Sequence, residues 1–406
     1  MTFPDQAVPS DPSGVGRRNR LFLPVASFLN DFAWETVVML LPLFIVNVLG
    51  ASALAVGVVE GVGDATSTVA KLVSGILADR TGSRKRLTAA GYLLAGLSRP
   101  LLYFVTFWQG ALVIRFTERL GKGIRTSPRD ALLADSTPEG ETGRAFGWLR
   151  TGDTLGAFGS MLVGLLVIYM VQGNAGQLRS ETFRTLVLVA TVPGLLALVT
   201  ILVAIRDVPA RTRVGLDLAA RQGLPRSFFG YTAIAAVFTL ANSSDAFIIL
   251  RAQNVGGSTL LIVALFAGFN FVYAALSRPL GGLSDRIGKH WVIAGGWLLY
   301  AGTYFGFGVT SSFFWLALLL VPYGVYYAAT EGVTRALVAD VVPSGSRGAA
   351  FGIFNGALGA SALFGSLIAG ALYSSISPAA PFYVGAGLAA VSGAMMLVLA
   401  MRRDRG

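Results

Sequence analysis

The feature that most constrains this chain is a series of apolar runs without charged residues. Four such runs cover residues 36–59, 154–178, 185–205 and 252–277. A helix needs about 20 apolar residues to cross the ~30 Å hydrocarbon core of a bilayer, so each run is long enough to span a membrane. Two longer runs, 291–330 and 348–401, can each form a helical hairpin because polar residues interrupt them at 310–312 and 374–378. The sequence therefore predicts an all-α polytopic membrane protein.

Composition supports this class of protein and excludes several others. Of the 406 residues, 54% are hydrophobic and only 13% are charged, whereas soluble proteins have about 25% charged residues. Glycine is abundant, with 50 residues, and small residues let helices approach closely inside a membrane. The chain has no cysteine and one histidine, His290. Disulfides, thiolate metal sites and multi-histidine metal sites are therefore excluded.

Division of the long runs at their polar breaks gives twelve predicted membrane spans. They are approximately 21–49, 54–78, 87–107, 109–134, 145–172, 183–205, 227–250, 256–284, 291–310, 312–340, 349–374 and 379–401. A basic stretch, 206–226, lies between the sixth and seventh spans. We therefore expect a six-helix bundle at 1–205, a cytoplasmic linker at 206–226 and a second six-helix bundle at 227–406.

The basic residues are distributed unevenly about these spans. Twenty Lys and Arg residues lie in the N-terminus, the C-terminus and the loops that follow even-numbered spans, whereas the opposite side has Arg179, Arg184 and Arg251. Cytoplasmic loops of membrane proteins carry the excess of basic residues. The distribution predicts a multi-pass protein of the cell inner membrane with both termini in the cytoplasm. It accounts for much of the net charge of +11 without a nucleic-acid partner.

Three sequence matches indicate an internal repeat. Residues 75–87 and 281–293 share the frame Gly-x-Leu-x-Asp-Arg-x-Gly at an offset of 206. Ala-Leu-Leu-Ala-Asp at 131–135 matches Ala-Leu-Val-Ala-Asp at 336–340, and Phe-Gly at 146–147 recurs at 351–352, both at an offset of 205. The chain therefore consists of two homologous halves, and internal repeats of this kind are typical of secondary transporters.

The loop after the second span resembles the signature of the major facilitator superfamily, Gly-x-Leu-x-Asp-Arg-x-Gly-Arg-Lys. The matching residues are Gly75, Leu77, Asp79, Arg80, Gly82 and Arg84, with Ser83 at a position that is usually basic. The resemblance covers the whole chain and implies twelve helices in two halves that alternate access to a central cavity. It also implies a conformational latch made of Gly75, Asp79, Arg80, Gly82 and Arg84, with Asp285 and Arg286 in the second half.

Seventeen ionisable residues fall inside the predicted spans, and twelve of them lie on the first, second, fourth and fifth. A charge that faces lipid costs about 3 kcal/mol on insertion scales, so these groups must pair or line a polar cavity. In the superfamily, those four helices line the N-terminal side of the central cavity. The charge placement therefore agrees with the architecture that the resemblance implies.

Spacing brings these charges together. Asp31 and Glu35 are four residues apart, as are Glu60 and Asp64, so each pair shares one helix face. We expect a network for proton coupling and substrate binding that consists of Asp31, Glu35, Glu60, Asp64, Arg115, Glu118, Arg119, Lys122 and Asp153. In the second half, the candidates for substrate contact are Asn242, Asp245, Asn270, Glu331 and Arg335.

Two local motifs refine the resemblance. The segment 119–132 is similar to that of bacterial permeases labelled as drug or metabolite exporters. Within it, Arg119-x-x-Lys122-Gly123 resembles the family's Arg-x-x-Gln-Gly motif, whose Arg is implicated in proton transfer, with Lys122 in place of Gln. The fifth span matches the family's antiporter motif only in part, because Ser160 stands where that motif has proline.

These features favour a secondary active transporter over an enzyme or an ATP-driven pump, since no Gly-x-x-x-x-Gly-Lys-Ser/Thr motif is present. The leading hypothesis is proton-coupled export of a small organic solute by a monomer in the lipid bilayer, with no cofactor and no resident metal. One alternative is an anion carrier that uses the cations of the fourth span. Another is a divalent-metal, iron-type exporter with oxygen ligands from Asp31, Glu35, Glu60, Asp64 and Asp245. The metal hypothesis requires these acids to escape pairing with Arg115 and Arg119.

Overall fold

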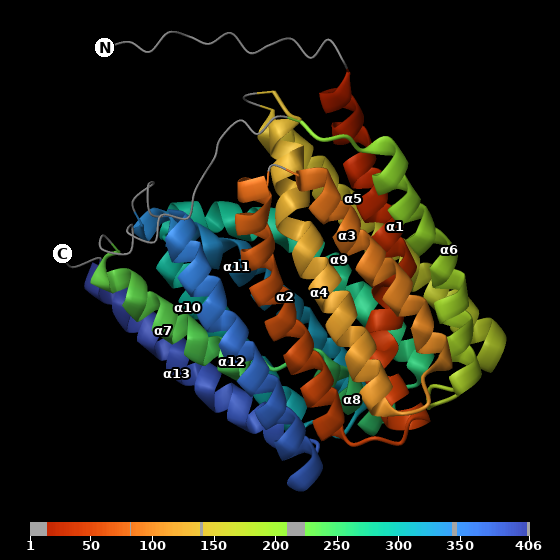
Figure 1. Ribbon diagram of the computed structural model, residues 1–406. Coiled ribbons are helices and arrows are strands. Elements are labelled where there is room, and N and C mark those ends of the chain that lie inside the picture. The colour runs from red at the N-terminus through yellow and green to blue at the C-terminus, as the bar shows by residue number, and fades with distance from the viewer. Residues whose placement is uncertain (1–13, 82, 139–140, 209–223, 343–346, 404–406) are drawn as a thin grey trace.

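The structure is a computed structural model that describes residues 14–81, 83–138, 141–208, 224–342 and 347–403. Most of the predicted linker, at 209–223, and Gly82 of the signature loop lie outside the described residues. The described chain is helical almost throughout (Figure 1).

The first half runs from α1 to α6. Its elements are α1 (Val15–Leu43) with a π-helical extension η1 (Phe44–Val48), α2 (Ala53–Thr81), α3 (Arg84–Ser98) with a 3-10 extension η2 (Arg99–Phe104), α4 (Trp108–Asp135), α5 (Thr142–Gln172) and α6 (Ser180–Ala204). The second half comprises α7 (Arg226–Ala241), α8 (Ala246–Asn254), α9 (Thr259–Ile287), α10 (Lys289–Val309), α11 (Phe313–Val341), α12 (Arg347–Ser375) and α13 (Ala380–Arg403).

These elements form the twelve predicted spans. Ten segments of the described chain are long and apolar enough to cross a membrane, and α7 with α8 count among them as one segment, Arg226–Asn254. The two remaining spans are α3 with η2, and α4, whose 28 residues carry the dense row of charges between Arg115 and Asp130. The all-α, twelve-helix architecture predicted from the sequence is confirmed.

Besides the first span, which ends in the π-helix η1, two of the predicted spans are not continuous α-helices. The third changes to a 3-10 helix at Arg99, next to Pro100, because proline cannot donate a backbone hydrogen bond. The seventh breaks at residues 242–245, Asn-Ser-Ser-Asp, between α7 and α8. Short polar side chains there compete with helical hydrogen bonds; the Ser244 hydroxyl accepts from the Ala246 amide.

The two halves stand side by side, with α2 packed against α12 and α5 facing α9 (Figure 1). Glycines allow α2 and α12 to touch along a seam: a Cβ added to Gly370 would lie 2.9 Å from the carbonyl oxygen of Ala53. We call the end of the bundle where α1 begins and α13 ends the terminal end, and the other the distal end. At the distal end Ser258 donates to Asn174 (2.7 Å) and the Leu54 amide donates to Ser374 (3.0 Å). These bonds join the halves there.

Candidate functional site

A cavity of about 410 Å³ lies between the two halves, midway along the helices. Its N-terminal wall comes from α1, α2, α4 and α5, and its C-terminal wall from α7 to α9, α11 and α12. The polar lining residues are Glu35, Glu60, Asp64, Arg115, Arg119, Thr239, Asn242, Ser243, Ser244, Asp245, Asn270, Tyr327 and Ser366. Charge therefore gathers on the N-terminal wall, while amides, hydroxyls and one carboxylate form the other.

Close packing of α4 against its neighbours positions the charged wall. A Cβ added to Gly121 of α4 would lie 2.7 Å from the carbonyl oxygen of Gly91 in α3, so only glycine lets the two helices meet there. On the side of α2, Gly63 lies beside the stems of Arg115 and Arg119; an added Cβ would be 3.1 Å from Cγ of Arg119. The α4 arginines therefore reach α2 and α3 at short range.

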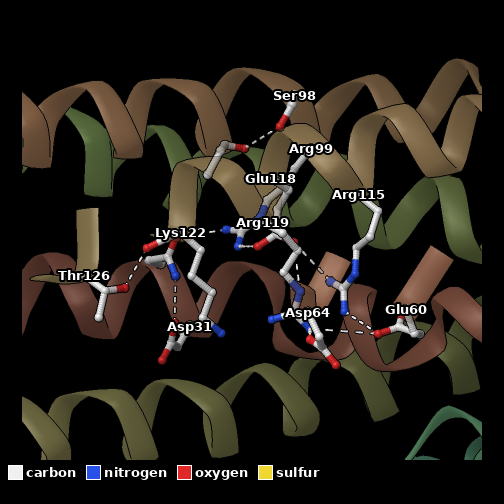
Figure 2. Close-up of polar contacts among 12 residues, drawn as sticks. Asp31, Glu60, Asp64, Ser98, Arg99, Arg115, Glu118, Arg119, Lys122 and Thr126 are labelled. Atoms are coloured by element: carbon white, nitrogen blue, oxygen red, sulfur yellow. Dashed lines mark hydrogen bonds and ion pairs between the residues drawn. The ribbon is translucent and has the colours of Figure 1, made fainter. Parts of the chain in front are cut away.

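Arg115 is the centre of a buried ion-pair network (Figure 2). Its guanidinium donates to Glu60 of α2 at 2.8 Å and to Glu118 of α4 at 3.1 Å. Glu118 also accepts from Arg99 at 2.6 Å. All four side chains are 4–6% exposed. Charged groups removed from water this completely are tolerated because each has an opposite charge and hydrogen bonds.

Arg119 extends the network toward the cavity. Its guanidinium lies 3.3 Å from Asp64 and 3.9 Å from Glu60, and its Nε lies 3.8 Å from Glu118. Figure 2 shows Arg115 and Arg119 pointing from α4 toward Glu60 and Asp64 of α2. The three arginines Arg99, Arg115 and Arg119 thus face three carboxylates, those of Glu60, Asp64 and Glu118. The network therefore has no net charge, and we call it the neutral unit.

Other predicted network residues lie beside this unit without joining it. Glu35 lines the cavity, and its carboxylate makes no hydrogen bond or ion pair with any residue that the structure describes. The carboxylate of Asp31 accepts a hydrogen bond from its neighbour Asn30 at 2.7 Å and, within the described chain, forms no ion pair. The ammonium of Lys122 points to the same region as Asp31 in Figure 2. In the described part of the chain, Oδ1 of Asp153 is buried without a hydrogen-bond partner.

The C-terminal wall is built around the break in the seventh span. Asp245 accepts from the Tyr323 hydroxyl at 2.6 Å, and Asn242 donates to Tyr326 at 3.1 Å. Asn270 of α9 also lines the cavity. Tyr323 and Tyr326 belong to a ring cluster; the centroids of Tyr323 and Tyr300 are 6.0 Å apart. Buried aromatic packing therefore holds the hydroxyls that orient Asp245 and Asn242.

Glu331 and Arg335 lie farther toward the terminal end than the cavity. Glu331 accepts from Tyr273 at 2.5 Å and lies 4.0 Å from Arg335, whose side chain is 70% exposed. Neither residue lines the central cavity. The structure thus brings three of the five second-half candidates, Asn242, Asp245 and Asn270, to the cavity wall.

The predicted latch residues lie at the terminal end. Arg84 forms an ion pair with Asp135, which joins the start of α3 to the end of α4. In the second half the corresponding ion pair is formed by Lys289, which was not among the predicted latch residues. Its ammonium lies 2.5 Å from a carboxylate oxygen of Asp340 and 3.8 Å from one of Asp285. Arg286 is exposed, and Gly75 lies next to Ser127 of α4. Gly82 and the side chains of Asp79 and Arg80 are outside the described residues.

Sequence reasoning missed part of the network. Arg99 lies on the third span, outside the four helices expected to line the cavity, yet it donates to Glu118 and to Asn30 (2.9 Å) and lies 5.5 Å from the ring of Trp34. It was the one charge on that span, and a lone intramembrane charge needs a partner. That signal could have identified it. The hydroxyl of Tyr323 gave no comparable signal.

Taken together, the fold and the site define a membrane carrier: two homologous six-helix halves enclose a charged cavity. The profile of the Major Facilitator Superfamily matches residues 24–249 and 227–406. An uncharacterized MFS-type transporter of Methanocaldococcus jannaschii is 34% identical over 390 residues, which cover 94% of this chain and 95% of the relative. The chain belongs to the Major Facilitator Superfamily and is a transporter.

The chain is also similar to a more distant transporter relative and to solved structures of two transporters. The multidrug resistance protein MdtG of Salmonella paratyphi C is 29% identical over 299 residues, covering 70% of this chain and 71% of that protein. A crystal structure of a peptide transporter POT mutant with sulfate has a TM-score of 0.79 at 14% identity, covering 98% of this chain and 99% of that one. A mutant of the nucleoside transporter NupG has a TM-score of 0.78 at 14% identity, covering 94% and 99%. At such low identities these structures show the fold alone.

Proposed function

We propose that this protein exports a small organic solute by alternating access, in exchange for protons, and that both termini lie in the cytoplasm. The proposal adds direction, substrate class and coupling to the transporter class established above. In this state the halves are joined at the distal end by hydrogen bonds between Ser258 and Asn174 and between Leu54 and Ser374. Because these bonds join the halves at the distal end, this state would load a solute from the terminal end, which is the cytoplasmic side in this proposal.

The observation that carries the proposal is the contrast between Glu35 and its neighbours. The arginines beside it are already matched by Glu60, Asp64 and Glu118. The carboxylate of Glu35 lines the cavity and has no hydrogen bond or ion pair within the described chain. An unpartnered carboxylate in a cavity can take either a cationic substrate group or a proton.

Exchange of solute for protons follows if the cationic group of the solute and the proton compete for the same carboxylates. A carboxylate that loses water or a cationic partner favours its protonated form. Substrate bound at the cavity would displace the proton, and closure of the empty cavity would require the proton to be bound. Arg119, at the rim of the neutral unit, lies next to Asp64 and can change partner when the halves move.

Purified protein in proteoliposomes with an imposed pH gradient tests this function. We expect gradient-driven flux of an organic solute that is abolished in Asp31→Asn and Arg119→Ala. Glu181→Gln is the matched control, because Glu181 is an exposed residue in the first turn of α6. Wild-type flux in both site variants would remove the network from the mechanism.

The two alternatives predict different results in the same vesicles. An anion carrier gives flux that depends on solute charge but not on the pH gradient; the pairing of Arg115 and Arg119 with carboxylates leaves it less supported. A metal exporter gives divalent-cation flux that Asp31→Ala abolishes. Within the described residues no group of three His, Cys, Asp or Glu side chains is arranged to hold a metal ion.

A further inference from the structure

We propose that a second cavity, between α5 and α9, is an entry site through which an amphipathic organic cation passes from the bilayer to the central cavity. This inference rests on the proposed function and names its substrate class. The second cavity has a volume of about 660 Å³ and is lined by α1, α5 and α9. It shares two lining residues, Glu35 and Asn270, with the central cavity. The two spaces therefore meet at those side chains.

One wall of this cavity belongs to the bilayer-facing surface. Leu155, Leu162 and Leu166 of α5 are spaced by seven and four residues, so they lie on one helix face, and each is more than half exposed. Of these, Leu155 also lines the cavity, together with the exposed Phe158. On α9, Phe271 is 72% exposed and lines the opposite wall. The cavity thus begins among exposed apolar side chains of α5 and α9.

The other side of the bundle is closed. There α2 and α12 are in direct backbone contact, since a Cβ on Gly370 would lie 3.0 Å from Cα of Leu54 and a Cβ on Gly61 would lie 3.0 Å from the carbonyl oxygen of Leu363. No comparable glycine contact between α5 and α9 occurs among the described glycines; Gly152, Gly156, Gly159 and Gly164 of α5 pack on α1 instead. The α2–α12 side is therefore sealed by backbone contact, whereas the α5–α9 side contains the second cavity.

Charge selects the kind of solute. The charged residues that line the second cavity are Asp31, Glu35, Asp153 and Arg150. The electrostatic neighbours of Arg150 are Tyr273 and Glu331 of the other half and Asp153. Three carboxylates thus face one guanidinium in this lining, and Oδ1 of Asp153 is buried without a hydrogen-bond partner in the described chain. An anion would meet repulsion here, whereas a cation would gain an electrostatic partner.

The apolar side chains that line the second cavity set a second requirement for the solute. Leu155, Phe158 and Phe271 offer a surface that a small hydrophilic cation cannot use but that hydrophobic substituents can cover. Aromatic faces also attract cations. The site therefore fits a molecule that dissolves in the bilayer through its apolar part and presents a positive charge to Glu35.

Matched probes test the charge and the apolar part separately. Tetraphenylphosphonium and tetraphenylborate have the same shape and opposite charge, and tetramethylammonium keeps the charge without the apolar part. In nanodiscs we expect saturable binding of tetraphenylphosphonium that falls at least about tenfold, or ~1.4 kcal/mol, in Glu35→Gln. Tetramethylammonium should compete at least about tenfold less well, and tetraphenylborate, titrated alone in a separate sample because the two tetraphenyl ions associate, should bind at least about tenfold more weakly. Equal binding of tetraphenylborate would overturn the cation assignment.

Single cysteines locate the site, because the chain has none of its own. We expect tetraphenylphosphonium to slow N-ethylmaleimide labelling of Ala274→Cys, in the second cavity, and of Thr239→Cys, in the central cavity. Labelling of Gln177→Cys, at an exposed position in the loop between α5 and α6, should not change. Ser277→Cys replaces Ala274→Cys if that variant does not fold. Protection at Thr239 alone would show direct entry into the central cavity and overturn the entry site.

These measurements need no proton gradient, so they separate the two proposals. Binding and protection without gradient-driven flux would retain the entry site and contradict proton exchange. Gradient-driven flux of another solute, without tetraphenylphosphonium protection at either cavity, would retain transport and contradict the entry site.

Discussion

The ammonium of Lys289 lies 2.5 Å from a carboxylate oxygen of Asp340, and the pair repeats the contact between Arg84 and Asp135. Both partners are displaced by the same number of residues, since 289 − 84 and 340 − 135 are both 205. In each half the pair joins the start of the third span to the end of the fourth, α3 to α4 and α10 to α11. The internal repeat thus extends from sequence to a conserved ion-pair geometry.

The two pairs differ in burial, so we expect their loss to have unequal effects. The Arg84 and Asp135 side chains are 6% and 9% exposed, whereas those of Lys289 and Asp340 are 21% and 51% exposed. Loss of one partner from a buried pair costs about 3–5 kcal/mol, and from an exposed pair about 0–1 kcal/mol. Asp135→Asn should therefore lower the melting temperature of the detergent-solubilised protein clearly more than Asp340→Asn. Equal shifts would contradict this assignment.

The neutral unit around Arg115 predicts a positive coupling between its members. Arg115→Gln leaves Glu60 and Glu118 with fewer partners in a buried site and should lower the free energy of unfolding by about 3–5 kcal/mol. Removal of the charge on Glu60 as well, in Glu60→Gln with Arg115→Gln, should restore part of that loss. A double-mutant cycle by denaturant unfolding measures the coupling. Additive losses would show that the pair is not an energetic unit.

The seam between α2 and α12 predicts a position-specific effect of one methyl group. In Gly370→Ala the new Cβ would lie 2.9 Å from the Ala53 carbonyl oxygen and 3.0 Å from Cα of Leu54, so the backbones must separate. In Gly352→Ala, on the same helix, the nearest atom is a side-chain carbon of Leu72 at 3.8 Å, an ordinary contact. We expect Gly370→Ala to cost about 1–3 kcal/mol as an overpacked site. Gly352→Ala should match the wild type in thermal stability and transport.

Regular elements and charge placement were predictable from the sequence because each depends on a local pattern. Apolar run length set the twelve spans, and the steps of three and four between Arg115, Glu118 and Arg119 set one face of α4. The 205-residue repeat also fixed the relation between Asp135 and Asp340. None of these patterns requires knowledge of tertiary packing.

The choice of ion-pair partners could not be predicted, because it depends on the packing of whole helices. Glu60 pairs with Arg115, whereas Glu35 has no hydrogen-bond or ion-pair partner in the described chain. The difference arises from the glycine contacts that bring α4 close to α2. The break at residues 242–245 was missed for a related reason, since its polar side chains are stabilised by Tyr323 and Tyr326 from distant α11.

The contact between Asp245 and Tyr323 predicts separable effects on folding and transport. Asp245→Asn keeps a side-chain oxygen that can accept from the Tyr323 hydroxyl, so unfolding free energy should change by no more than about 1 kcal/mol. It removes a negative charge from the cavity wall, and gradient-driven flux should fall at least about tenfold, equivalent to ~1.4 kcal/mol.

Tyr323→Phe should lower stability more, and transport less, than Asp245→Asn does. It deletes the donor and leaves a buried carboxylate with one fewer hydrogen bond, which costs about 1–3 kcal/mol of stability. The negative charge remains, so flux per folded molecule should fall less than in Asp245→Asn. Tyr383→Phe, at an exposed tyrosine of α13, controls for hydroxyl loss elsewhere. Thermal unfolding and proteoliposome flux of the three variants decide the matter: equal flux in Asp245→Asn and wild type would restrict Asp245 to a structural role in the break between α7 and α8.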